Sequence, residues 1–373
     1  MRKHLKYTSL LVAVGMIGMS QVSRAEEKAA GSFWDNTKVT GSLDTSYNYN
    51  LNRPLNTGAG ATSPYRLYDA TTNSFNVNLV ELAIENAPAD WLTFRTDLDF
   101  GSDAKLNNTL EAFGAGTEIF NLQQAYASIK APIGNGLTFK VGKFVTLHGA
   151  EVIESAYNSN SSRGLLFSYA IPITHTGIMA NYAFNDQISL DLGVVNGWNN
   201  VSDINSGKSI HGMLTIKPFE KLTWLVGGTF GPENPGNDAK WRSLIDTTLT
   251  YAVNDQLSLS ANYDWLRDRG LTGSSGVSDV QGIAAYINYK ASDTCGLSLR
   301  GEYLRDDVNF ALATTPSNKI YEGTLTTHYY FADGFDLRFE FRHDQGNNAS
   351  FTKGSGSTRK FQDTIGSQLV YSF

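Results

Sequence analysis

The chain has 373 residues, a formal net charge of -6 and a sequence pI near 5.6, so it lacks the basic character expected of a nucleic-acid-binding protein. Its mean hydropathy is -0.26, and beyond the N-terminal region it has no apolar run of the roughly 20 residues that a membrane-spanning helix needs. Charged residues make up 18% of the chain, below the usual share of roughly 25%, whereas glycine (35 residues) and aromatic residues (12%) are abundant. This composition is typical of a protein built from strands and turns.

The N-terminus has the three parts of a secretory signal peptide. Basic residues at positions 2, 3 and 6 precede an uncharged apolar stretch, and Ser23 and Ala25 provide a small-residue cleavage site. A permanent membrane anchor is less favoured, because the apolar stretch is short. We therefore predict a signal peptide at residues 1–25, a single mature domain at residues 26–373, and export through the periplasm. Cys295 is the only cysteine, so no intrachain disulfide can form.

From about residue 39 onward, the dominant pattern is an alternation of apolar and polar residues with a period of two. Residues 335–344 (FDLRFEFRHD) are the clearest case, because Phe and Leu occupy the odd positions up to 341 and Asp, Arg and Glu the even positions up to 342. Residues 92–100 and 297–303 alternate in the same way. Successive side chains of a β-strand point to opposite faces, so this pattern predicts strands with one apolar and one charged face.

Short turn signals and long polar connections alternate along the chain. Each turn signal stands between two strand-like runs, which is the arrangement of a β-hairpin. The seven turns lie at residues 87–90, 132–136, 185–186, 218–221, 254–255, 291–294 and 332–334. The eight long connections lie at residues 51–74, 102–118, 145–174, 196–208, 231–240, 268–278, 306–317 and 345–359. This alternation predicts about sixteen antiparallel strands, with short periplasmic turns and long extracellular loops.

The position of the aromatic residues distinguishes a membrane barrel from a soluble β-sandwich, which would also show alternation. On the apolar face they gather near both strand ends, as at Phe184 and Tyr251 by the short turns and at Trp265 and Phe341 toward the long loops. Two such girdles match the two interfaces of a bilayer. A sheet in lipid cannot leave an edge unpaired, so the first and last strands must pair. We therefore predict an all-β, transmembrane, antiparallel up-and-down β-barrel of about 16 strands in the cell outer membrane, with a lumen too wide for side chains to fill.

Three stretches resemble Gram-negative outer-membrane porins, and most of all the OmpL-like group of β-barrel porins. They are residues 122–144 (LQQAYASIKAPIGNGLTFKVGKF), 161–177 (SSRGLLFSYAIPITHTG) and 192–200 (LGVVNGWNN). With similar hairpins downstream, the likeness spans essentially the mature chain. It implies a water-filled channel for passive diffusion of small hydrophilic solutes and ions, in contact with outer-membrane lipid and lipopolysaccharide. It also implies a homotrimer.

The longest connection, residues 145–174, is the candidate constriction of this channel. In sixteen-stranded porins the loop in this position folds into the lumen, so the resemblance implies the same here. Its candidate site residues are His148, Glu151, Glu154 and Arg163, and an apolar run at residues 165–172 would anchor it. The alternative is an ordinary surface loop whose charges are solvated.

Charged residues on the polar strand faces are the candidate lining of the lumen. A basic wall opposite an acidic loop would create a transverse field that orients polar solutes. Both signs alternate along the wall, so the sequence predicts neither cation nor anion preference, and any single charge could serve only to solvate the lumen. An inward position for Glu81 and Glu85 requires a register change within residues 75–85. The main wall candidates are Arg95, Asp97, Lys140, Arg300, Glu302, Arg338, Glu340 and Arg342.

The last ten residues, TIGSQLVYSF, are interpreted as the final strand, which closes the ring against residues 39–50. They are also similar to the signal by which the barrel assembly machinery recognises its clients, after periplasmic chaperones have carried them. The alternative is simply another amphipathic strand, which does not explain why the chain ends there. The signal residues are Thr364, Gly366, Leu369, Tyr371 and Phe373.

Enzymatic motifs are absent from the sequence. It contains no G-x-S-x-G, H-E-x-x-H, phosphate-binding loop or cysteine-based metal motif, and the histidines of the mature chain are scattered. We therefore predict no enzymatic activity, cofactor or metal. Two alternatives stay open, namely a barrel-embedded hydrolase that assembles a Ser-His pair in space, and an adhesin or receptor that acts through its long loops.

Overall fold

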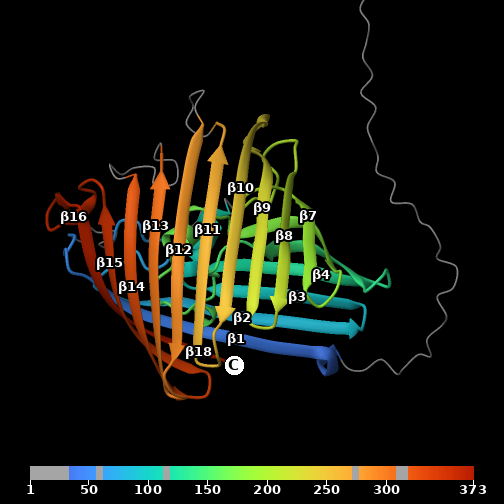
Figure 1. Ribbon diagram of the computed structural model, residues 1–373, viewed down its shortest axis with the longest axis horizontal. Coiled ribbons are helices and arrows are strands. Elements are labelled where there is room, and N and C mark those ends of the chain that lie inside the picture. The colour runs from blue at the N-terminus through green and yellow to red at the C-terminus, as the bar shows by residue number, and fades with distance from the viewer. Residues whose placement is uncertain (1–32, 56–61, 112–117, 271–276, 308–317) are drawn as a thin grey trace, which may run out of the picture.

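The computed structural model describes residues 33–55, 62–111, 118–270, 277–307 and 318–373. Within these ranges, sixteen strands hydrogen-bond into one closed antiparallel barrel (Figure 1), which confirms the predicted fold class. Consecutive strands are neighbours, and β18 closes the ring between β1 and β15. The barrel strands are β1 (Thr37–Asn50), β2 (Ser74–Ala89), β3 (Leu92–Phe100), β4 (Phe120–Ala131), β5 (Leu137–Val145), β6 (Thr174–Ala183), β7 (Ile188–Val195), β8 (Ser209–Phe219), β9 (Leu222–Asn234), β10 (Asn237–Ala252), β11 (Leu257–Asp268), β12 (Ser278–Lys290), β13 (Cys295–Asp306), β14 (Lys319–Ala332), β15 (Phe335–Gly346) and β18 (Phe361–Ser372).

The remaining elements of the described chain lie in the connections. A separate two-stranded sheet, β16 (Phe351–Lys353) and β17 (Ser357–Arg359), occupies the connection between β15 and β18. The helices are η1 (Phe33–Asn36), α1 (Ser102–Leu110), η2 (Ser155–Tyr157) and α2 (Leu165–Tyr169). None of the helices in the described ranges is long and apolar enough to cross a membrane. The predicted signal peptide lies outside the described residues.

The alternating pattern places each strand face as predicted. On β15, Phe339 and Phe341 point outward and are 54% and 44% exposed, whereas Arg338, Glu340 and Arg342 point inward and are buried. The period of two therefore separates an apolar outer surface from a polar lumen.

The connections follow the predicted order, with two corrections. The connection expected at residues 231–240 is instead a continuation of the sheet, because β9 runs to Asn234 and β10 starts at Asn237, with Asn237 opposite Asn234. The polar residues there led to the prediction of a loop, but the paired strands extend past the apolar band and end in a tight turn. The turn expected at residues 87–90 is also shorter, because β2 continues to Ala89.

The predicted register change in β2 is confirmed at Asn78. Asp44 of β1 lies opposite Leu79, whereas the next residue, Thr45, lies opposite Val77, so Asn78 forms a bulge. The bulge reverses the alternation of β2 and turns Glu81 inward, where it is 7% exposed.

The predicted closure by the last strand is also confirmed. β18 pairs with β1, and Leu43 lies opposite Tyr371. Two backbone hydrogen bonds join Phe373 to Gly41 of β1, since Phe373 N–H donates to Gly41 O (3.0 Å) and Phe373 O accepts from Gly41 N–H (3.2 Å). The ring of Tyr371 stacks on Phe335 with centroids 4.3 Å apart. The chain therefore uses its final residue to complete the ring.

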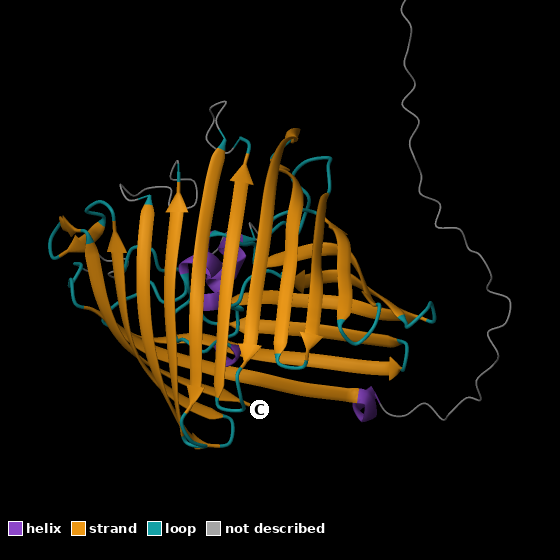
Figure 2. Ribbon diagram, viewed as in Figure 1, coloured by secondary structure: helices purple, strands orange, loops and turns teal. Residues whose placement is uncertain are grey.

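The barrel interior is not an open tube. Both α-helices lie within the ring of strands (Figure 2). Buried Leu165, Leu166 and Phe167 of α2 form one hydrophobic cluster with inward-facing residues of the wall, such as Leu244 on β10 and Leu304 on β13. This side of the lumen is filled by apolar packing.

Candidate constriction site inside the barrel

The loop between β5 and β6 enters the lumen and crosses it. We call residues 146–173 the inward loop. A bond from Thr146 N–H to Ile173 O (3.0 Å) ties its two roots together. Near its start, the ring of His148 lies 2.9 Å (Nε2 to Oγ1) from Thr229 on β9. Further along, the hydroxyl of Ser155 donates to Asp44 on β1. β1 and β9 lie on opposite sides of the sixteen-stranded ring, so the loop spans its full width.

On the β13 wall, the inward loop is held by a buried ion pair and by backbone bonds. The Arg300 guanidinium donates to Glu151 Oε1 (2.7 Å) and also to Ser162 O (2.7 Å). The other oxygen of Glu151 accepts from Gly164 N–H (2.6 Å), and the carboxylate of Glu302 accepts from Leu165 N–H and Leu166 N–H at the start of α2. A carboxylate at this place satisfies backbone N–H groups that the helix itself cannot pair.

On the β15 wall, two further arginines bind the same loop. Arg338 donates to Ser155 O (3.0 Å), and Arg342 donates to Arg163 O (2.8 Å). Between them, Glu340 accepts from Ser161 N–H (2.7 Å). Arg342 is fully buried and also pairs with Asp344 at 2.7 Å. The three wall arginines predicted on β13 and β15 are therefore neutralised beneath the loop.

A glycine on β12 makes room for the apolar part of the loop. A Cβ atom at Gly282 would lie 2.6 Å from Leu166 Cδ1, which is closer than real carbon atoms approach. The missing side chain lets α2 pack directly on the wall. The apolar run at residues 165–172 thus has the anchoring position expected from the sequence.

On the β1 side, the closing contacts are polar. The Asp44 carboxylate accepts from Asn78 Nδ2 (2.9 Å) and from Gln368 Nε2 (2.9 and 3.0 Å), besides the Ser155 hydroxyl. Glu154 accepts from Gln123 Nε2 (2.9 Å). Burial raises the pKa of the Glu154 carboxyl.

The chain matches one protein-family model over nearly its full length. Residues 36–373 match the family model described as "Putative beta-barrel porin-2, OmpL-like". The chain belongs to this family. It is therefore a channel-forming porin of the outer membrane, in agreement with the resemblance seen in the sequence. No curated protein matches it.

Solved outer-membrane proteins share the barrel of this porin. The anion-selective porin from Comamonas acidovorans has a TM-score of 0.61 at 12% identity, covering 90% of this chain and 99% of that chain. OprB of Pseudomonas putida has a TM-score of 0.60 at 11% identity, with 91% and 95% covered. OmpT of Vibrio cholerae in its trimer form has a TM-score of 0.59 at 14% identity, with 90% and 99% covered. At these identities the likeness concerns the fold.

The remaining wall candidates of the porin lie away from these loop contacts. Arg95 and Asp97 bond to each other along β3 (2.9 Å). Lys140 of β5 lies over the ring of Tyr126, 4.5 Å from its centroid. Their charges are balanced or shielded within the β3–β5 part of the wall.

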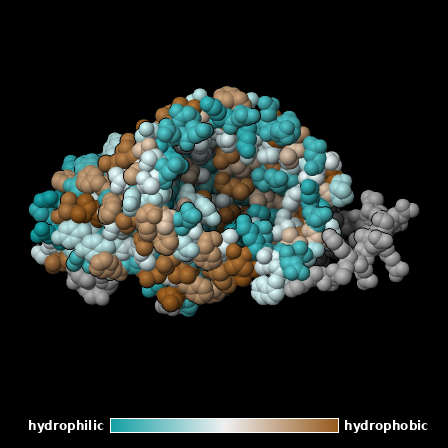
Figure 3. Space-filling view, turned by 90° about the horizontal axis from the view of Figure 1, so that it is seen from below, coloured by the Kyte–Doolittle hydropathy of each residue, from teal (hydrophilic) through white to brown (hydrophobic). Residues whose placement is uncertain are grey.

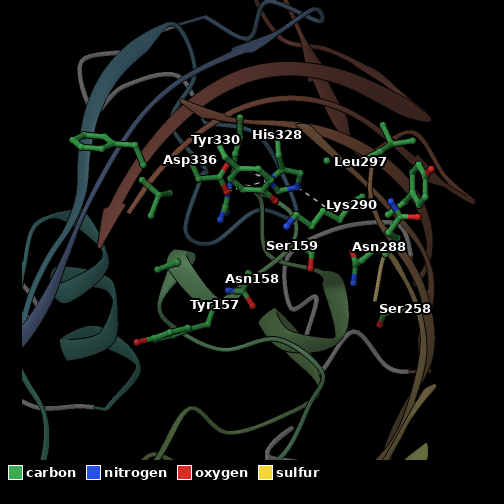
Figure 4. Close-up of a pocket in the computed structure, with 18 of the residues that line it drawn as sticks. Tyr157, Asn158, Ser159, Ser258, Asn288, Lys290, Leu297, His328, Tyr330 and Asp336 are labelled. Atoms are coloured by element: carbon green, nitrogen blue, oxygen red, sulfur yellow. Dashed lines mark hydrogen bonds and ion pairs between the residues drawn. The ribbon is translucent and has the colours of Figure 1, made fainter. Parts of the chain in front are cut away.

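Below the inward loop, at the short-turn end, the porin has a vestibule of about 620 Å³. Figure 3 shows this end of the molecule hollowed, and Figure 4 shows Tyr157 and Asn158 of the loop facing wall residues across the cavity. The vestibule wall contains a hydrogen-bonded chain of three side chains. Ser298 Oγ lies 3.1 Å from His328 Nε2, and His328 Nδ1 lies 3.0 Å from Asp336. The Ser-His pair considered from the sequence thus exists in space.

Three other histidines, which looked scattered in the sequence, meet at the roots of the inward loop. The ring centroid of His211 on β8 lies 4.1 Å from that of His175 on β6 and 4.7 Å from that of His148. Sequence spacing carried no signal for this cluster, because its members come from three separate elements. Throughout the described ranges, no group of three His, Cys, Asp or Glu residues could hold a metal ion.

Proposed function

We propose that the inward loop is the constriction of the channel and that small hydrophilic solutes and ions diffuse passively past it. The supporting observation is that the loop bonds to opposite sides of the ring, through His148 to Thr229 and through Ser155 to Asp44. Glu151, Glu154 and Arg163 belong to the same constriction.

Thiol labelling tests the constriction directly. Tyr157 projects from the inward loop into the vestibule and is 75% exposed. In a Cys295→Ser background, we expect Tyr157→Cys to lose single-channel conductance when a bulky thiol reagent is added. The matched control is Asp186→Cys on an exposed short turn, which should react without a change in conductance. Equal conductance before and after labelling of residue 157 would contradict the proposal.

Passive transport requires no covalent step, and we propose that the porin is not an enzyme. One observation favours ester hydrolysis as a second candidate, namely the chain Ser298–His328–Asp336 beside the vestibule. The carboxylate would hold the imidazole so that Nε2 accepts the serine proton. However, Asp336 also accepts from Arg338 Nε (2.6 Å), which divides its charge between two partners. A fluorophosphonate that labels the wild-type porin but not Ser298→Ala would establish the hydrolase. If the wild type is not labelled, the channel is the only function that remains.

We further propose a homotrimer, supported by the family resemblance and by the trimer form in which OmpT of Vibrio cholerae is described. Light scattering of the detergent-solubilised porin tests it, because a monomer would have one third of the expected protein mass. We also propose that residues 1–25 are removed on export, which intact-mass measurement of the membrane form would check.

The C-terminal strand is proposed to be the segment that the barrel assembly machinery reads. Its signal residues Thr364, Gly366, Leu369 and Tyr371 belong to β18, which pairs with β1 and β15, and the signal ends at Phe373. Periplasmic chaperones and lipopolysaccharide are proposed partners on the path to the membrane.

A further inference from the structure

Two gaps flank the inward loop, one toward β10–β12 and one toward β1 and β18. The gap toward β10–β12 has about 90 Å³ and opens to the vestibule, because Tyr157, Asn158 and Asn288 line both. Tyr286 in its wall belongs to the same hydrophobic cluster as Leu166 of α2. Most of its other lining residues are polar, such as Thr248, Thr250 and Ser260.

The gap toward β1 and β18 is closed by hydrogen bonds. It has about 10 Å³, near the smallest space that holds one water molecule. Asp44, Ser155 and Gln368 line it. The Ser155 hydroxyl and the Gln368 amide both donate to Asp44, and Arg338 donates to Gln368 Oε1 (3.3 Å). Arg338 also lines the vestibule, so these bonds separate the gap from the vestibule. Water can replace each of them at little net free energy, so this side can open.

Acidic residues predominate around this second gap. Its charged lining residues within the described ranges are Asp44, Asp69, Asp103 and Arg163. Arg66 pairs with Asp69, which removes that carboxylate from the balance. Arg163 bonds to Val152 O (3.0 Å) and its guanidinium lies 5.2 Å from the centre of the Tyr68 ring. When both are ionised, the negative charges of Asp44 and Asp103 therefore exceed the single positive charge of Arg163.

A second set of carboxyl groups lies behind the gap. Asp99 on β3 is fully buried, and neither of its carboxylate oxygens has a hydrogen-bond partner. It interacts electrostatically with Glu154, Glu81, Asp97 and Asp103. Negative groups held in a surrounding of low polarity attract cations into a narrow passage and repel anions.

We infer that cations cross the constriction on the β1–β18 side, through the gap between Asp44 and Asp103, when the hydrogen bonds among Ser155, Gln368 and Asp44 exchange with water. The basic wall residues do not oppose this preference, because Arg300, Arg338 and Arg342 are engaged under the inward loop. The inference rests on the proposed channel function and assigns it a charge preference that the sequence left open.

The cation preference should strengthen with rising pH. Burial and the neighbouring Asp44 raise the pKa of the Asp103 carboxyl. The ionisable groups that face it are Asp44, Asp99, Arg163 and Tyr68. Below its raised pKa Asp103 is neutral, and above it the second carboxylate of the gap is present, so selectivity is gained as pH rises.

Reversal potentials across a planar bilayer with a potassium chloride gradient test the inference. At a pH above the raised pKa of Asp103, we expect wild type to favour potassium over chloride, and Asp103→Asn to move the permeability ratio toward one. The matched control Glu220→Gln removes one negative charge from an exposed short turn and should keep the wild-type ratio. Conductance without cation preference, or an unchanged ratio in Asp103→Asn, would overturn the inference and leave the channel intact. Absence of any conductance would instead refute the proposed function as well.

A labelling measurement keeps the test independent of how well a charge variant folds. Ser46 lines the gap, so Ser46→Cys in the Cys295→Ser background reports the local potential. We expect a cationic thiosulfonate to react on the order of tenfold faster than an anionic one of similar size, since local fields of this kind enrich counter-ions by that factor or more. Equal rates, or faster reaction of the anionic reagent, would overturn the inference.

Discussion

Arg300 on β13 and Glu151 of the inward loop form a buried ion pair of 2.7 Å, with side-chain exposures of 0% and 5%. The pair is not isolated, because Arg300 Nε also lies 2.9 Å from Glu322 and 3.7 Å from Glu302. One guanidinium thus contacts three carboxyl groups at the place where the loop meets the wall.

Removing Arg300 should detach the inward loop from β13. In Arg300→Met the carboxylates stay buried without their cation, and breaking a buried pair in this way typically costs about 3–5 kcal/mol. We expect a lower denaturation midpoint and faster proteolysis within residues 146–173.

The matched control for that change is the double variant Arg300→Met with Glu151→Met. The double variant removes the uncompensated carboxylate of Glu151, so in a double-mutant cycle it should recover part of the unfolding free energy that Arg300→Met loses. Additive effects of the two single changes would show that the pair contributes nothing to loop position.

A side chain at position 282 should displace α2. In Gly282→Ala the new methyl group would lie 2.6 Å from Leu166 Cδ1, and overpacking of this kind typically costs about 1–3 kcal/mol. The change in unfolding free energy should be relieved when Leu166→Ala is added. Gly323→Ala on β14 is the matched control, because a Cβ there has nothing within 4 Å. Equal destabilisation at both glycines would point to a backbone effect in place of the contact with α2.

Deletion of Phe373 should reduce barrel insertion much more than synthesis or export. The deletion removes the proposed recognition residue and both backbone hydrogen bonds between Phe373 and Gly41. The share of heat-modifiable, folded barrel in outer-membrane fractions measures the effect. Phe373→Ala keeps the backbone hydrogen bonds to Gly41 and loses only the aromatic side chain. Normal insertion of this variant would mean that the aromatic side chain is not a recognition signal and that residue 373 acts only as part of the closing strand.

Stability should depend on pH through Glu154. Burial raises the pKa of this carboxyl in the folded porin, so the folded state binds its proton more tightly than the unfolded chain does. The resulting stabilisation is complete below the unfolded pKa of about 4.3 and is lost as pH rises through the folded pKa. Glu154→Gln mimics the neutral form and should be free of this loss. Denaturation midpoints of the two proteins across pH should therefore diverge as pH rises, and parallel curves would contradict the shift.

Much of the barrel could be predicted because its signals are local. The alternation in residues 335–344 correctly placed Arg338, Glu340 and Arg342 inward. The turn signals gave the right number of strands, since each hairpin is specified by a few adjacent residues. The connection at residues 231–240 was misjudged because a strand that extends beyond the apolar band carries the same polar residues as a loop.

Local sequence patterns could not predict which residues pair with the inward-facing charges. Arg300 and Glu151 are 149 residues apart, and nothing near either residue in the chain indicates the other. The histidines at positions 148, 175 and 211 meet only because the loop roots and β8 are brought together by the ring.

The sequence by itself determined which faces meet lipid and which meet the lumen, how many strands there are, and that the last strand must pair with the first. These follow from a period of two and from the need to pair every backbone group in a membrane. Only the tertiary structure decided that apolar packing fills the β10–β14 side and that Asp44 and Asp103 border a gap on the other side. The reason is that closure of the ring sets the path of the inward loop, and the path selects which charges are neutralised and which remain beside the gap.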